Sequence, residues 1–144
     1  MNLIENKERI FSQVAQAMET ANRTDQVNVI AVTKYVGIDQ AKALVDTGVR
    51  HIGENRVDKF LEKYQALKDE GLTWHLIGSL QRRKVKEVIN YVDYFHALDS
   101  MKLAQEIQKR ASHPIKCFIQ VNISGEESKH GFAPEELDAL LPEM

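Results

Sequence analysis

Cysteine is nearly absent from this sequence: Cys117 is the only one in 144 residues, so a disulfide within the chain is impossible. Long apolar runs are also missing, and none approaches the roughly 20 residues that a membrane-spanning helix needs. The first residues lack the basic flank and apolar core of a signal peptide. The formal net charge of −2 gives no general attraction to nucleic acid or membranes. We therefore expect a soluble cytoplasmic protein with neither of these as a partner.

Several binding motifs are absent as well. The sequence contains neither the G-x-G-x-x-G pattern of dinucleotide sites nor the G-x-x-x-x-G-K-[ST] pattern of P-loops. The spacing of its cysteine and histidines does not match a zinc site. The sequence therefore lacks the motifs that usually indicate a nucleotide-binding protein or a structural zinc site.

What the sequence does contain is one repeated unit. A helical periodicity over residues 3–22 comes first, and strand-like runs then begin near residues 28, 50, 73, 94 and 115. A helical pattern follows each run. Short, almost continuously apolar runs rich in β-branched residues are typical of parallel strands buried on both faces. The repeat predicts a single α/β domain over residues 1–144, with a parallel sheet and helices outside it.

Two architectures fit five strand–helix units. One is a five-stranded doubly wound sheet, which is complete at this length. The other is an incomplete (β/α)8 barrel, a fold that normally needs about 250 residues. The last helical segment starts at Pro134 and has barely two turns before the sequence stops, which favours the barrel.

Ligands of parallel α/β folds bind at the carboxyl ends of the strands, and Lys34 ends the first strand-like run. Strand alternation puts Ile30, Val32 and Lys34 on one face. A partly desolvated lysine amine is more often neutral, and a neutral amine can attack an aldehyde to form a Schiff base. The other interpretation is a solvated lysine just past the strand.

Asn55 and His75 are the next candidates. Asn55 follows the second strand and could orient a ligand, or it could cap the next helix, since Asn is a favoured N-cap residue. His75 lies inside the third strand, with Trp74 and Leu76 expected on the opposite face. It could face a ligand, or it could be a core histidine with a satisfied hydrogen bond. Ser79 is expected to cap the helix that follows.

Four motifs, in order and near the expected spacing, resemble one family. They are AVTK at residues 31–34, IGEN at 52–55, WHLIGSLQ at 74–81 and QVNISGEESKHG at 120–131. The chain resembles the pyridoxal phosphate homeostasis protein family, also called the YggS or proline-synthetase-associated family. The match extends from the first strand to the loop after the fifth.

The resemblance implies a fold and a function. The fold is a single TIM barrel like the N-terminal domain of alanine racemase, with about five of its βα units present. The cofactor is pyridoxal 5′-phosphate (PLP), held as a Schiff base on Lys34, with Asn55 and His75 lining its pocket. The family is regarded as one that binds PLP and buffers or delivers it without established turnover. PLP-dependent apo-enzymes are its possible recipients.

The family's phosphate-binding cup and a late arginine lie in the last barrel strands, beyond these 144 residues. The resemblance therefore predicts that a full-length parent is a monomer that binds PLP well. The fragment is expected to bind PLP poorly, and its unpaired first and fifth strands favour self-association.

Three other functions stay open. A racemase-like enzyme needs a second acid/base, which in the alanine racemase group is a tyrosine from a separate domain. A flavodoxin-like binding domain would want an acidic residue or a phosphate loop after the first strand, where the sequence has Lys34 and 35–39. The third is an inactive fragment that binds no cofactor.

Overall fold

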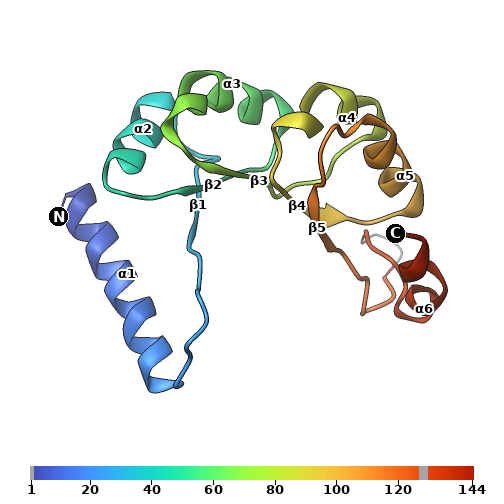
Figure 1. The fold of residues 1–144 in the computed structure, drawn as a ribbon, viewed down its shortest axis with the longest axis horizontal. Coiled ribbons are helices and arrows are strands. Elements are labelled where there is room, and N and C mark those ends of the chain that lie inside the picture. Colours follow the sequence, from blue (N-terminus) through green and yellow to red (C-terminus); the bar gives the residue numbers. More distant parts are fainter. Residues whose placement is uncertain (1, 127–129) are drawn as a thin grey trace.

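The computed structural model describes residues 2–126 and 130–144, so positions 127–129 of the fourth family motif lie outside it. The sheet has five parallel strands in the order β1-β2-β3-β4-β5 (Figure 1). The strands are β1 (Ile30–Val32), β2 (His51–Glu54), β3 (Thr73–Leu76), β4 (Tyr94–Leu98) and β5 (Lys116–Ile119). Each strand thus pairs with the next one along the chain.

Helices connect the strands. The α-helices are α1 (Leu3–Thr20), α2 (Ile38–Asp46), α3 (Val57–Leu67), α4 (Arg82–Val88), α5 (Met101–Arg110) and α6 (Leu137–Leu140). The 3-10 turns are η1 (Lys68–Glu70), η2 (Ile89–Tyr91), η3 (Pro134–Glu136) and η4 (Leu141–Glu143). Among the residues that the structure describes, no helix is both long and apolar enough to cross a membrane.

Strand order and helix placement together decide between the two predicted architectures. A doubly wound sheet reverses its strand order and has helices on both faces. In this sheet the order is sequential, and α2, α3, α4 and α5 lie along the same face (Figure 1). This is the arrangement of successive units in a (β/α)8 barrel. The predicted barrel architecture is confirmed, and the doubly wound alternative is wrong.

The core lies between the sheet and these helices. Alternate side chains of the strands point into it, and Ile52, Leu76 and Phe95 are fully buried there. The ring of Trp74 meets the rings of Phe60 and Tyr64 on α3, with centroids 5.5 and 5.3 Å apart. The expected opposite orientation of Trp74 and His75 is confirmed, because His75 instead contacts histidines of the neighbouring strands.

Two strands are shorter than their apolar sequences indicate. The predicted run 28–34 yields a strand of three residues, and the run 115–123 yields one of four. Both are outer strands of the sheet with one partner each: β1 begins where β2 begins, with Ile30 opposite His51, and β5 ends where β4 ends, with Ile119 opposite Leu98. Beyond β5, Val121 forms an isolated parallel bridge with Phe132.

Removal of one core ring tests this packing. Phe60 is fully buried and meets Trp74 edge to face, so Phe60→Ala should lower the free energy of unfolding by about 3–5 kcal/mol. Urea denaturation followed by tryptophan fluorescence measures the change. The control is Lys59→Ala at the exposed neighbouring position, with an expected change within about 0.5 kcal/mol. Equal effects of the two substitutions would contradict the assigned core.

Candidate functional site

Lys34 lies just beyond the carboxyl end of β1. Its side chain is exposed, and its Nζ lies 5.1 Å from the ring centroid of Tyr35, itself 89% exposed. Of the two interpretations, the solvated lysine just past the strand fits this exposure, and the partly desolvated amine does not. The amine is instead open to any aldehyde that reaches the end of the strand.

Asn55 lies at the end of β2, half-buried, where two strands approach each other closely. The amide N–H of Ile77 donates to the carbonyl of Glu54 at 2.9 Å, and a Cβ at Gly78 would overlap the carbonyl of Asn55. Glycine at position 78 thus allows β3 to end directly beside Asn55. This close approach fixes the position of the Asn55 backbone at the carboxyl edge of the sheet.

The capping interpretations of two residues are wrong. Arg56, not Asn55, occupies the N-cap position of α3, and Gln81, not Ser79, occupies that of α4. Neither cap residue accepts a side-chain hydrogen bond from its helix. Asn55 is thereby left available at the strand end, where the ligand-orienting interpretation places it.

His75 is the middle member of a row of three imidazoles, which we call the histidine row (His51, His75 and His96). Its Nε2 lies 3.0 Å from Nδ1 of His51 on β2, and its Nδ1 lies 2.9 Å from Nε2 of His96 on β4. The ring of Tyr94 stacks on it, with centroids 4.7 Å apart. His75 is 3% exposed, so the interpretation as a buried histidine with satisfied hydrogen bonds is supported.

The surroundings of His75 and His96 favour the neutral imidazole. Burial, reinforced by repulsion from His96 and His51, lowers the pKa of His75 from 6.5 to about 4. Burial also lowers the pKa of His96. Across residues 2–126 and 130–144, no group of three or more His, Cys, Asp or Glu side chains is placed to hold a metal ion. The row is therefore a hydrogen-bonded chain in which burial favours the neutral form of His75 and His96.

A buried ion pair lies on the opposite side of the sheet, beneath β1 and β2. Lys63 of α3 donates from Nζ to Oε2 of Glu54 at 2.8 Å and to the carbonyl of Thr33 at 2.9 Å. The hydroxyl of Thr33 donates to the same Glu54 oxygen. The side chains of Lys63 and Glu54 are 3% and 0% exposed. We call Thr33, Glu54 and Lys63 the buried clamp.

Sequence reasoning missed the partners of these residues, although two signals were present. His51, His75 and His96 recur at the pitch of the strand–helix repeat, which predicts neighbouring places on successive strands. Lys63 is spaced with Phe60 and Leu67 on one helical face, and all three are buried. A lysine at core spacing requires a buried anion, which here is Glu54.

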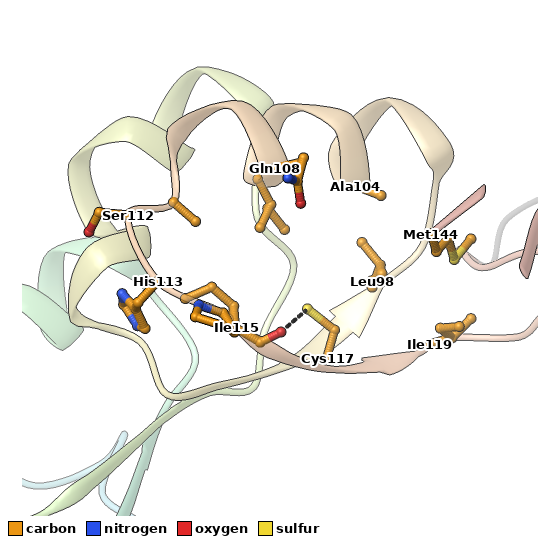
Figure 2. A pocket seen from close by; sticks show the side chains of 12 residues that line it. Leu98, Ala104, Gln108, Ser112, His113, Ile115, Cys117, Ile119 and Met144 are labelled. Atoms are coloured by element: carbon orange, nitrogen blue, oxygen red, sulfur yellow. Dashed lines mark hydrogen bonds between the residues drawn. The ribbon is translucent and has the colours of Figure 1, made fainter. Parts of the chain in front are cut away.

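A pocket of about 490 Å³ lies elsewhere, between α5 and β5. Figure 2 shows Ala104 and Gln108 above it, Ile115, Cys117 and Ile119 below, and Met144 at one end. The Cys117 thiol points toward the carbonyl of Ile115, and burial raises its pKa. Lys34, Asn55 and His75 do not line this pocket, so it is separate from the candidate site.

Comparison with known proteins identifies the family. The family described as "Alanine racemase, N-terminal domain" matches residues 6–144. The chain belongs to this family. The match covers every βα unit described above, so the alanine racemase N-terminal fold expected from the sequence motifs is confirmed.

Individual relatives agree with that family. The chain is 40% identical over 145 residues to the pyridoxal phosphate homeostasis protein of Aquifex aeolicus, a match that covers 98% of this chain and 64% of the relative. It is 32% identical over 142 residues to the protein of the same name from Pseudomonas aeruginosa, covering 96% of this chain and 62% of that one. The predicted resemblance is confirmed. The chain spans less than two thirds of the length of these curated relatives.

Solved structures support the fold. PipY of Synechococcus elongatus with PLP bound superposes with a TM-score of 0.81 at 28% identity, covering 99% of this chain and 63% of that one. Alanine racemase of Corynebacterium glutamicum superposes with a TM-score of 0.59 at 15% identity, covering 79% of this chain and 34% of that one. At that identity the second likeness concerns the fold alone.

The histidine row predicts a pH dependence of stability. The pKa of His75 is lower in the fold than its ordinary value, so the unfolded chain binds the extra proton between pH 6.5 and about 4. The free energy of unfolding should therefore be largest above pH 6.5 and fall as the pH approaches 4. Denaturant midpoints across this range measure the effect.

His75→Gln should flatten that part of the profile, because glutamine does not titrate. The control is His113→Gln, since the His113 ring lies apart from the row and contacts the carbonyl of Val92. It should keep the decline. An NMR titration that places His75 at its ordinary pKa of 6.5 would contradict this account.

Proposed function

We propose that this chain binds PLP through a Schiff base on Lys34 and takes part in cytoplasmic PLP homeostasis. The observation that carries the proposal is the position of Lys34: an exposed primary amine at the carboxyl end of β1, where barrels of this kind bind ligands. Relatives named pyridoxal phosphate homeostasis protein, and PipY with PLP bound, match almost the whole chain.

The residues around Lys34 fit an aldehyde cofactor. Val32, on the same side of β1, is 49% exposed, and Gly53 on β2 adds no side chain beside it. Asn55 adds an amide donor and acceptor at the next strand end. Bound there, the cofactor supplies an aldehyde that condenses with the amine, forming one C=N bond and releasing one water.

Asn55 and His75 have different parts in this proposal. Asn55 orients the cofactor by hydrogen bonding, since its side chain does not cap α3. His75 forms a neutral floor, because both its ring nitrogens already contact other imidazoles and burial keeps its pKa low. The phosphate would be held by barrel strands of the longer relatives that this chain does not span. We therefore expect weak PLP binding by these 144 residues.

The partners follow from the same proposal. PLP-dependent apo-enzymes would receive the cofactor by exchange of the Lys34 imine for one of their own lysines. A second copy of the chain would be a further partner, because β1 and β5 are the outer strands of the sheet. The alternative of a racemase is supported by the family match and by a likeness to one alanine racemase at 15% identity, and the second of these concerns the fold alone.

Borohydride trapping tests the proposal. The purified chain is incubated with PLP and reduced, and its peptides are mapped by mass spectrometry. We expect one dominant adduct on Lys34, and Lys34→Arg should abolish it, because a guanidinium does not form the imine.

The matched control is Lys116→Arg. Lys116 is exposed on β5, and its Nζ lies 5.1 Å from the ring centroid of Tyr94, the same distance as between Lys34 and Tyr35. This substitution should leave the Lys34 adduct unchanged. Adducts spread evenly over Lys116 and other exposed lysines would refute the assignment and favour a fragment without a cofactor site.

A further inference from the structure

The buried clamp holds the chain directly before two candidate site residues. Thr33 precedes Lys34, and Glu54 precedes Asn55. Their strands are already joined here, because the amide N–H of Thr33 donates to the carbonyl of Gly53 at 3.0 Å. Lys63 then adds one bond to the carbonyl of Thr33 and another to the Glu54 carboxylate. The clamp therefore ties both strand ends to α3.

The same carbonyl starts the turn that carries Lys34. The oxygen of Thr33 accepts from the amide N–H of Val36 at 3.2 Å as well as from Lys63 at 2.9 Å. Lys34 and Tyr35 lie between Thr33 and Val36, the two residues that this hydrogen bond joins. Since the Lys34 side chain is exposed beside an exposed ring, its direction depends on this backbone more than on side-chain packing.

An ion pair at this depth has a large desolvation cost. Pairs of this kind are often matched or exceeded in stability by apolar residues of similar volume. One oxygen of Glu54, Oε1, is buried without a hydrogen-bond partner within the described part of the chain, so Oε2 receives both donors. A gain in stability is therefore a weak explanation for the presence of this ion pair. A more specific explanation is that the pair fixes the position of the Thr33 carbonyl.

We infer that Lys63 and Glu54 are positioning residues that fix the backbone of Lys34 for cofactor capture. Lys63 acts from the helix side through the Thr33 carbonyl, and Glu54 orients Lys63 and the Thr33 hydroxyl. Strand alternation then directs Lys34 to the opposite side of the sheet from Thr33. This inference deepens the proposed function and rests on it for the role of Lys34.

The decisive variant is the double substitution Glu54→Gln with Lys63→Met. It removes both charges and nearly preserves volume, so the chain should remain folded, whereas Lys63→Met alone strands a buried carboxylate and should be much less stable. The control removes an exposed pair: Lys42→Met with Asp46→Asn, whose atoms lie 2.5 Å apart at 43% and 59% exposure.

The first measurement needs no cofactor. Amide hydrogen exchange of Val36 should be about tenfold faster in the double variant, the effect of losing one charge-assisted hydrogen bond to the turn. Exchange in β3 and β4 should stay unchanged, and so should the control pair at every position. Unaltered exchange of Val36 in a folded double variant would overturn the inference.

The second measurement is the share of borohydride-trapped PLP found on Lys34. It should fall several-fold in the double variant and remain unchanged in the control. Faster exchange of Val36 with an unchanged share would overturn the inference, since the loosened turn would then not matter for capture. Faster exchange with no Lys34 adduct even in the unaltered chain would refute the proposed function and still support the clamp's hold on Lys34.

Discussion

The structure depends on the burial of one face of a parallel sheet against the helices that connect its strands. Strand alternation divides the side chains into two sets. Ile52, Leu76 and Phe95 enter the core, whereas Val32 and Phe118 point away and stay 49% and 56% exposed. The candidate site belongs to the second set. Its residues can therefore be polar or exposed without weakening the core that holds the strands in order.

The histidine row and the buried clamp offset the free-energy cost of burying polar groups in different ways. The histidine row lies on the face away from α2–α5, where its rings hydrogen-bond one another and burial keeps the pKa of His75 low. The buried clamp lies on the helix side and accepts charge, with Lys63 against Glu54 at 2.8 Å. Only the clamp touches the backbone that carries Lys34. In the proposed function, the histidine row forms the floor of the site and the clamp fixes the direction of the Lys34 amine.

Much of the fold could be predicted from sequence, because the strand–helix repeat is a local pattern. The order of the strands could not, since a five-unit repeat serves a doubly wound sheet equally well. What separates the two is the side of the sheet to which each helix returns, and this depends on long-range packing. The lengths of β1 and β5 were overestimated for a related reason: an apolar run forms a ladder only where a neighbour is present.

The site shows the same division. Lys34, Asn55 and His75 could be picked out because they follow or interrupt apolar strands. For Lys34 the sequence offered both a solvated and a partly desolvated amine and could not decide between them, since exposure depends on what covers the sheet's other face. The N-cap at Arg56 was also unpredictable, because Asn is the better capping residue, yet the close approach of Gly78 to Asn55 fixes where β2 ends. Identifying His51 and His96 required the register of the strands, and identifying Lys63 required the buried face of α3.

The histidine row has a property that no single imidazole has. When all three rings are neutral, each of the two contacts holds one proton, and His75 can donate in only one direction at a time. The row then has two tautomeric arrangements. If His75 donates to His96, then His51 donates to His75 and its own Nε2 is bare; if the direction reverses, that Nε2 carries the proton and Nδ1 of His96 is bare. A hydrogen bond made at one end of the row therefore selects donor or acceptor character at the other, across three strands.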